Sequence, residues 1–307
     1  MQERSHGARL GAPTLREVWR DYQMTRTLKP VTVRNYDYRL TVCLGDWLDR
    51  PVTEISKDEI ELRHRHIKGK AMANSTMRTL RALLRYAEYK YQDREGNPIL
   101  RNNPVRRLSE VRAWHKDRRR TRLILPAQLG AWFRAVFSLD SQTMRDYLLV
   151  LLLTGLRRSE AINLRWDDVD LGTGILTIHD TKNGDDLSIP VSDYAWNLLA
   201  MRKFAAQSEW VFPGPSQVKP ITAAHRSYKI VSQRSGVVFS PHDLRRTFVT
   251  VADDLDLKSE VIKALVNHRS SDVTEGYTIR SIERLRRATQ RITDAILIYG
   301  GLRRPRA

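Results

Sequence analysis

The stretch YLLVLLLTGLRRSE, residues 147–160, decides how the second half of the chain is interpreted. It holds the densest apolar run of the sequence, and it predicts a helix over residues 141–153 that is buried on nearly all sides. The run is too short to span a bilayer. Arg157 stands just past the predicted helix end, after Gly155, where a turn can expose its guanidinium at the edge of a core.

Further helices and one hairpin are predicted around this central helix. Two short strands, residues 174–179 and 187–191, flank the turn Lys182-Asn-Gly-Asp185, and Asn-Gly is a strong hairpin signal. The fold class expected for this half is therefore mainly α with a small β-sheet. The helices predicted by apolar spacing and by capping residues are 126–137, 192–206, 222–235, 241–254, 259–267 and 281–299.

The first hundred residues predict a separate bundle of four helices, with Thr14 and Ser56 as caps. On the last helix, Arg78, Arg81 and Arg85 line up away from the apolar face. Such a row is either a solvated surface or a set of contacts to a DNA backbone. The four predicted helices span residues 14–27, 31–48, 57–68 and 73–92.

A boundary follows, because Gly, Asn and Pro punctuate residues 93–104 and a basic cluster runs through residues 112–122. We expect a helical domain over residues 1–108, a basic linker over 109–125 and a mainly α domain over 126–307. A basic linker suits two domains that clasp a duplex, although an ordinary solvated linker has the same composition. Its candidate DNA contacts are Arg118, Arg119 and Arg120.

The net charge points to a polyanionic partner. The chain has 53 Lys and Arg against 35 Asp and Glu, which gives a net charge of +18. The excess lies early, since residues 1–125 hold 28 basic and 15 acidic residues against 25 and 20 in the remainder. Phosphate neutralisation by Lys and Arg releases condensed counterions and favours binding to nucleic acid. Charge alone does not separate DNA from RNA or an acidic membrane.

Four short motifs follow one another in the second half. Each is weak alone, but their joint order and spacing closely resemble the signature of the tyrosine recombinase (phage integrase) family. The resemblance covers the whole of residues 126–307, and the preceding helices look like the family's core-binding, SAM-like domain. The motifs are Thr154-Gly-Leu-Arg157-Arg-Ser-Glu160, Thr181-Lys182-Asn-Gly, Pro241-His242-Asp-Leu-Arg245, and Asn267-His268 followed nine residues later by Tyr277.

The chemistry of these residue types suits phosphodiester cleavage. The reaction needs a nucleophile, charge stabilisation for a pentavalent phosphorus and a proton for the leaving oxygen. Arg245 lies three residues after His242, so both can face one place from a single helix, and a helix N-terminus favours an anion. Arg157 and Arg245 could then hold the two non-bridging oxygens through their planar forks of donors.

The family resemblance implies a role for each residue. Arg157 and Arg245 would clamp the phosphate, with Glu160 steadying Arg157, and Lys182 would be the general acid. The sequence has neither a Gly-rich phosphate loop nor an Asp/Glu cluster suited to two metals, so no metal and no cofactor is expected. The remaining members are His242 as proton acceptor or orienter, His268 as a donor to the phosphate, and Tyr277 as nucleophile.

The expected function is site-specific recombination through a 3′-phosphotyrosyl intermediate, integrating or excising a phage or other mobile element. The expected partners are double-stranded DNA, three further copies of the chain in a homotetramer, and accessory DNA-bending or directionality proteins. Two alternatives stay open: a non-catalytic DNA-binding regulator and a type IB topoisomerase-like enzyme. With no apolar leader, a bacterial or phage-encoded cytoplasmic protein is expected. Longer integrases of the family often carry an additional N-terminal arm-binding domain, so the chain is expected to be either of the short type or a truncated piece.

Three further features carry lesser predictions. The amphipathic pattern of residues 282–299 needs a partner surface, either on its own domain or, as the resemblance favours, on a neighbouring subunit. Cys43 lies on an apolar stripe and is expected to be a buried thiol. His64 and His66 are two residues apart on a helix, which does not put two metal ligands on one face, so we expect a solvated face.

Overall fold

The computed structural model describes residues 12–116, 121–179, 186–222, 225–267 and 282–305. The chain forms two compact units, Met1–Arg120 and Thr121–Ala307, each with its own apolar core. Within the described residues, no helix is both long and apolar enough to cross a membrane.

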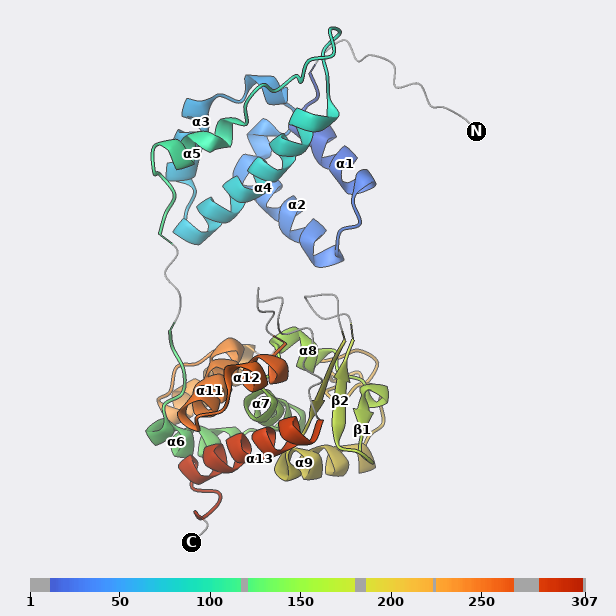
Figure 1. Ribbon diagram of the computed structural model, residues 1–307, viewed down its shortest axis with the longest axis vertical. Helices are drawn as coiled ribbons and strands as arrows, with labels where there is room; N and C mark the ends of the chain where they lie inside the picture. Colours follow the sequence, from blue (N-terminus) through green and yellow to red (C-terminus); the bar gives the residue numbers. More distant parts are fainter. Residues whose placement is uncertain (1–11, 117–120, 180–185, 223–224, 268–281, 306–307) are drawn as a thin grey trace, which may run out of the picture. The chain divides into compact units, whose positions relative to one another are not determined.

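The first unit is built around its longest helix, α4. This helix packs against α1, α2 and α3 (Figure 1). Its apolar face is buried from Ala73 to Ala87. Short 3-10 turns at Gly45–Trp47, Val52–Glu54 and Pro104–Arg106 connect the helices. The helices are α1 Leu15–Thr25, α2 Pro30–Leu44, α3 Lys57–His66, α4 Lys70–Lys90 and α5 Arg107–Glu110.

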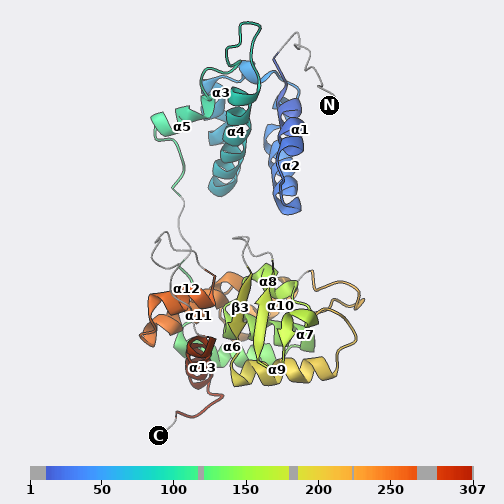
Figure 2. The same ribbon diagram turned by 45° about the vertical axis from the view of Figure 1, so that its right-hand side comes forward.

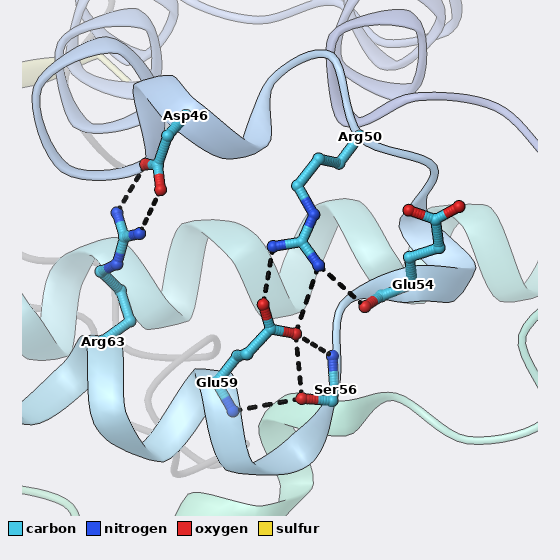
Figure 3. A network of polar contacts seen from close by, with 6 residues as sticks. All are labelled: Asp46, Arg50, Glu54, Ser56, Glu59 and Arg63. Carbon is cyan, nitrogen blue, oxygen red and sulfur yellow. Dashed lines mark hydrogen bonds and ion pairs between the residues drawn. The ribbon is translucent and has the colours of Figure 1, made fainter.

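A polar network holds the beginning of α3 against the preceding turn (Figure 3). Glu59 accepts from the Ser56 amide at 3.0 Å and from Arg50 Nη1 at 2.7 Å. The Arg50 hydrogen bond and the Ser56 amide lower the pKa of Glu59 to about 2. The Ser56 hydroxyl accepts from the Glu59 amide, which confirms the predicted Ser56 cap and completes a capping box.

The second unit surrounds the apolar helix α7, which is buried along nearly its whole length. Figure 1 shows α11 and α12 on one side of α7 and the sheet on the other. The helices are α6 Pro126–Phe137, α7 Gln142–Thr154, α8 Arg158–Ile162, α9 Asp193–Phe204, α10 His225–Ser235, α11 Pro241–Asp254, α12 Ser259–Leu265 and α13 Ile282–Tyr299, with a 3-10 turn at Trp166–Asp168.

The sheet has three antiparallel strands in the order β1-β2-β3, namely Val169–Asp170, Ile175–Ile178 and Leu187–Pro190. In Figure 2 the strands lie side by side with α9 across one end of them. The last pair of the β2–β3 hairpin is Ile178 with Leu187. The two predicted strands and the mainly α fold class are thus confirmed, whereas the turn that carries Lys182 lies outside the described residues.

Helix α13 packs on its own unit. It contacts α6, α7, α11, α12 and β3, and most of its apolar face is buried, although Tyr299 at its end is exposed. The expectation that this helix docks on a neighbouring subunit is therefore wrong for residues 282–299. The amphipathic pattern indicated a partner surface, and the core of the same unit provides it. The buried residues of the helix are Leu285, Ala288, Thr289, Ile292, Thr293, Ile296 and Leu297.

The environment of His64 on α3 differs from the one predicted from the sequence. His64 is buried, and its Nε2 lies 2.9 Å from Asn74 Oδ1. Burial lowers the pKa of its imidazole, so His64 is a neutral core residue and the expected solvated face is wrong for it. Cys43 is only partly buried at the edge of the same core.

We predict that Ile292→Ala destabilises the second unit by about 2–5 kcal/mol, because the side chain is 0% exposed and its loss leaves a cavity. Arg287→Ala, an exposed change on the same helix, should shift the free energy of unfolding by at most about 0.5 kcal/mol. Thermal and denaturant melts measure both variants. Equal small effects would show that α13 does not belong to the core.

Candidate active site

The turn after α7 sets the place of Arg157. Gly155 adopts a left-handed conformation with φ of 66°, and its amide donates to the Leu151 carbonyl at 3.1 Å. A Cβ at this position would meet Phe248 Cδ1 at 2.7 Å, so only glycine fits both the backbone angle and the space. The chain reverses here, and Arg157 becomes the N-cap of α8.

A carboxylate on the first turn of α8 fixes the Arg157 guanidinium. Glu160 accepts from Arg157 Nη1 at 2.6 Å and from the Arg157 amide at 2.7 Å. The Glu160 side chain is 6% exposed, while that of Arg157 is 24% exposed. The pair therefore anchors one edge of the guanidinium in the protein, with part of the group still open to solvent.

The second arginine, Arg245, points into the core from α11. Its Nη1 donates to the Gly155 carbonyl at 2.8 Å, and its Nη2 donates to the Val266 carbonyl. Burial, and then the positive charge of Arg157, lower the pKa of Arg245 to about 10, while Glu160 acts in the opposite direction. Arg245 therefore stays a cation at neutral pH, and its partners in the described part of the chain are carbonyls and not carboxylates.

The two guanidiniums converge on the end of α12. Asn267, with φ of 45°, turns the chain out of the helix in the left-handed conformation that asparagine tolerates. This turn presents two successive carbonyls, so that Arg245 binds that of Val266 and Arg157 binds that of Asn267 at 3.0 Å. The chain that leads to His268 is thus held by both arginines.

His242 lies exposed on the first turn of α11, three residues before Arg245. Partial burial lowers the pKa of its imidazole, and the positive charges of Arg246, Arg245 and Arg157 lower it further against the opposing charge of Asp243. The imidazole is therefore neutral at pH 7, in a state that can accept a proton.

A buried carboxylate holds the same first turn. Asp243 Oδ2 accepts from the Ser240 amide at 2.8 Å and from the Ser240 hydroxyl at 2.9 Å. The same oxygen accepts from Arg122 Nε at 2.8 Å, and Oδ1 accepts from Arg246 Nη1 at 3.0 Å. Burial opposes the ionisation of Asp243, but the bonds from Ser240 and Arg122 outweigh it and lower the pKa.

Four of the residues predicted from the sequence therefore meet in one place: Arg157, Glu160, His242 and Arg245. Three others, Lys182, His268 and Tyr277, lie outside the described residues, as do Arg118, Arg119 and Arg120. The row Arg78, Arg81 and Arg85 lies exposed on α4 of the first unit, and the Arg78 guanidinium lies 5.8 Å from the centre of the Trp114 ring.

Sequence reasoning missed two groups at the site. In the sequence Arg122 is only one end of a basic cluster. Its partner Asp243 lies 121 positions further along the chain, so the contact has no local signal. The carbonyls of Val266 and Asn267 carry no side-chain signal at all. Asn267 itself was a usable signal, because asparagine is favoured where a helix ends in the left-handed conformation.

This arrangement can bind an anion. Among the described residues, one carboxylate, Glu160, is hydrogen-bonded to Arg157 and none is hydrogen-bonded to Arg245, and the positive end of the helix dipole of α11 adds to the field. In the part of the chain that the structure describes, no group of three or more His, Cys, Asp or Glu residues is placed to hold a metal ion.

The model of the phage integrase family matches residues 128–284, just over half of the chain, including both arginines and His242. The chain belongs to the phage integrase family. The matched region also includes the segment that carries His268 and Tyr277.

Curated integrases and recombinases are similar to the chain over much of its length. Prophage integrase IntF of Escherichia coli (strain K12) is 29% identical over 272 residues, which cover 84% of this chain and 57% of that protein. Tyrosine recombinase XerA of Pyrococcus furiosus is 30% identical over 167 residues, 52% of this chain and 58% of that protein. The chain thus spans less than three fifths of the length of these relatives.

Solved structures share the fold. A lambda integrase(75-356) dimer bound to a COC' core site matches with a TM-score of 0.66 and 21% identity, covering 88% of this chain and 100% of that one. The Tn1549 transposon integrase in complex with transposon right end DNA matches with a TM-score of 0.67 and 18% identity, covering 92% and 100%. At these identities the likeness establishes the integrase fold alone.

We predict that Glu160→Gln destabilises the second unit by about 1–3 kcal/mol, because the nearly buried residue 160 then no longer offers Arg157 a charged acceptor. The matched control is Glu283→Gln. Its pair with Arg286 has the same three-residue spacing but is exposed, and its loss should cost at most about 1 kcal/mol. Denaturant melts compare the two variants, and an equal loss in both would show that Glu160 is an ordinary surface partner.

Proposed function

We propose that this phage integrase family member is a site-specific DNA recombinase that cleaves and rejoins strands through a 3′-phosphotyrosyl intermediate. The observation that supports it most is the convergence of Arg157 and Arg245 on the end of α12. The sequence places His268 directly after this point and Tyr277 nine residues further on. The two phosphate clamps would then hold the beginning of the stretch of chain that carries the nucleophile.

In the proposed reaction, the Tyr277 oxygen attacks the phosphorus and the bond to the 5′-oxygen breaks. Lys182 gives its proton to that leaving oxygen, and His242 takes the phenol proton or orients the phosphate. Rejoining reverses the step, because a 5′-hydroxyl attacks the phosphotyrosine. One phosphoester replaces another at each stage, so the exchange needs no energy source beyond the bond itself.

Arg157 and Arg245 would stabilise the negative charge of the transition state. A pentavalent phosphorane carries more negative charge on its non-bridging oxygens than the ground-state diester does, and preorganised donors favour that state. Arg245 is buried and fixed by two carbonyls, so it needs little reorganisation during the reaction. Arg157 is part-exposed and held by Glu160, which suits a group that meets an incoming phosphate.

The proposed partner is double-stranded DNA containing a recombination site, bound by a homotetramer during strand exchange. The net charge of +18 supports a DNA partner, as do the exposed row Arg78, Arg81 and Arg85 and the arginines 118–120. A solved relative, a lambda integrase tetramer bound to a Holliday junction, supports the assembly. The proposed recombination integrates or excises a phage or other mobile element. Accessory DNA-bending or directionality proteins are proposed as further partners.

Each of the three parts of the chain has a proposed role. Residues 1–108 would bind the core of the DNA site, residues 109–125 would form the basic linker, and residues 126–307 would hold the catalytic groups. Helix α5 and the partly buried Trp114 pack on the first unit, which brings the first part of the proposed linker into contact with its core.

Replacing the nucleophile tests the proposal. Tyr277→Phe should abolish the SDS-resistant adduct with a nicked duplex, since no other group would attack the phosphorus, and should leave DNA affinity within about twofold because one hydroxyl adds little to many phosphate contacts. The duplex is selected from a random-sequence library by the unaltered chain.

The outcomes of this test separate the alternatives. An adduct that persists in Tyr277→Phe would show that Tyr277 is the wrong residue. No adduct with the unaltered chain would favour a DNA-binding regulator. Relaxation of supercoiled plasmids that lack the selected sequence would favour a topoisomerase.

The pH dependence of cleavage tests His242. Since its pKa lies below the ordinary 6.5, the imidazole accepts protons at pH 7 and is protonated only at lower pH, so the cleavage rate should fall as pH drops through that pKa. Arg246→Gln removes one of the cations that lower this pKa, and the acid limb should move to higher pH. Arg234→Gln on α10, which does not act on His242, is the control. Identical acid limbs in all three proteins would rule out His242 as the proton acceptor.

A further inference from the structure

The first residues of the second unit lie along the helix that carries His242 and Arg245. Arg122 Nε donates to Asp243 Oδ2 at 2.8 Å, and the Ile124 amide donates to Thr247 Oγ1 at 2.9 Å. The Thr247 hydroxyl in turn donates to the Asp243 carbonyl at 2.9 Å, one turn earlier on the same helix. Two successive contacts thus fix this short segment to the first two turns of α11.

The Arg122 contact reaches a carboxylate that cannot turn to water. The Asp243 side chain is 1% exposed, whereas that of Arg122 is 43% exposed. An ionised carboxylate at such a site requires charged or hydrogen-bonding partners, because burial alone would neutralise it. Arg122 is one of three residues that supply them, together with Ser240 and Arg246.

We propose that Arg122 is a positioning residue for the reaction: through Asp243 it fixes the first turn of α11, and with it His242 and Arg245. The inference deepens the proposed function and rests on it. Asp243 stands between the two functional residues in sequence, and the oxygen that binds Arg122 also binds the Ser240 amide, so the contact acts on the backbone of this first turn. Small displacements of a catalytic group from its productive geometry can cost large factors in rate.

The location of Arg122 gives this contact a second consequence. Thr121 is the residue at which the second unit begins, directly after the basic arginines 118–120. A displacement of the chain at this boundary is transmitted to α11 by the Arg122–Asp243 ion pair and by the Ile124–Thr247 hydrogen bond. Arg122 thereby joins the segment between the units to the catalytic helix.

Arg122 could instead act only as a DNA phosphate contact, because more than a third of its side chain is exposed. The two roles differ in what they change. A lost phosphate contact weakens DNA binding and reduces the slope of log K against log salt by about 0.9. A lost positioning contact slows cleavage by bound protein and leaves that slope unchanged.

The test is a double-mutant cycle of Arg122→Ala and Asp243→Asn, in which asparagine keeps an acceptor for Ser240 but loses the charge. The full chain is assayed on the selected duplex for single-turnover cleavage and for DNA affinity at several salt concentrations. We expect Arg122→Ala to slow cleavage about tenfold with an unchanged salt slope, and the double variant to be no slower than Asp243→Asn. Arg122→Lys, which keeps a cation beside the carboxylate, should recover part of the rate.

Additive effects in the cycle, or a salt slope reduced by about 0.9, would overturn the proposal. A readout that needs no cleavage keeps it distinct from the proposed function. In DNA-free protein, Arg122→Ala should shift the titration of the His242 imidazole, followed by NMR, to higher pH, because the negative charge of Asp243 is then less compensated. A titration unchanged by Arg122→Ala contradicts the proposal even if Tyr277 fails as the nucleophile. A melting temperature close to that of the unaltered chain excludes unfolding as the cause.

Discussion

The site depends on one buried cation, the Arg245 guanidinium. A charge inside a protein must be neutralised or hydrogen-bonded, and here two main-chain carbonyls, those of Gly155 and Val266, meet this requirement. Because carbonyls carry no net charge, the cation is anchored without being cancelled, and the nearby carboxylate Glu160 is bonded to the other arginine. The centre is left with a positive excess that suits a phosphate diester, and the same two bonds tie the ends of α7 and α12 to α11.

The packing around the end of α7 holds the Gly155 carbonyl in place beside Arg245. Helix α7 is apolar on all sides because it is surrounded, and its end must turn sharply where Phe248 of α11 leaves no room for a side chain. Gly155 meets both conditions and places its carbonyl next to Arg245. Gly155 is therefore needed for packing at the end of α7, and its carbonyl also accepts a hydrogen bond from the buried Arg245 guanidinium.

Much of this could be predicted from the sequence where side chains carry the signal. The limits of α6 and α11 agree with the prediction to the residue, and their first residues, Pro126 and Pro241, mark the start of each helix because proline is favoured in a first turn. The contacts that assemble the site could not be predicted in the same way, since a carbonyl has no sequence identity and Arg122 meets Asp243 only after the chain has folded. The partner of α13 was also beyond the sequence, because an amphipathic pattern indicates that a face is buried but not which surface covers it.

The two buried carboxylates near the centre act in different places. Glu160 binds the guanidinium that is part-exposed to solvent, so it sets where a phosphate contact can form. Asp243 binds no group that would meet the phosphate in the proposed reaction; its partners are Ser240, Arg122 and Arg246, and it fixes the backbone from which His242 and Arg245 project. Of these partners, only Arg122 comes from a distant part of the sequence. The start of the unit therefore reaches the first two turns of this helix through two contacts, Arg122 with Asp243 and the Ile124 amide with Thr247, next to the backbone that carries His242 and Arg245.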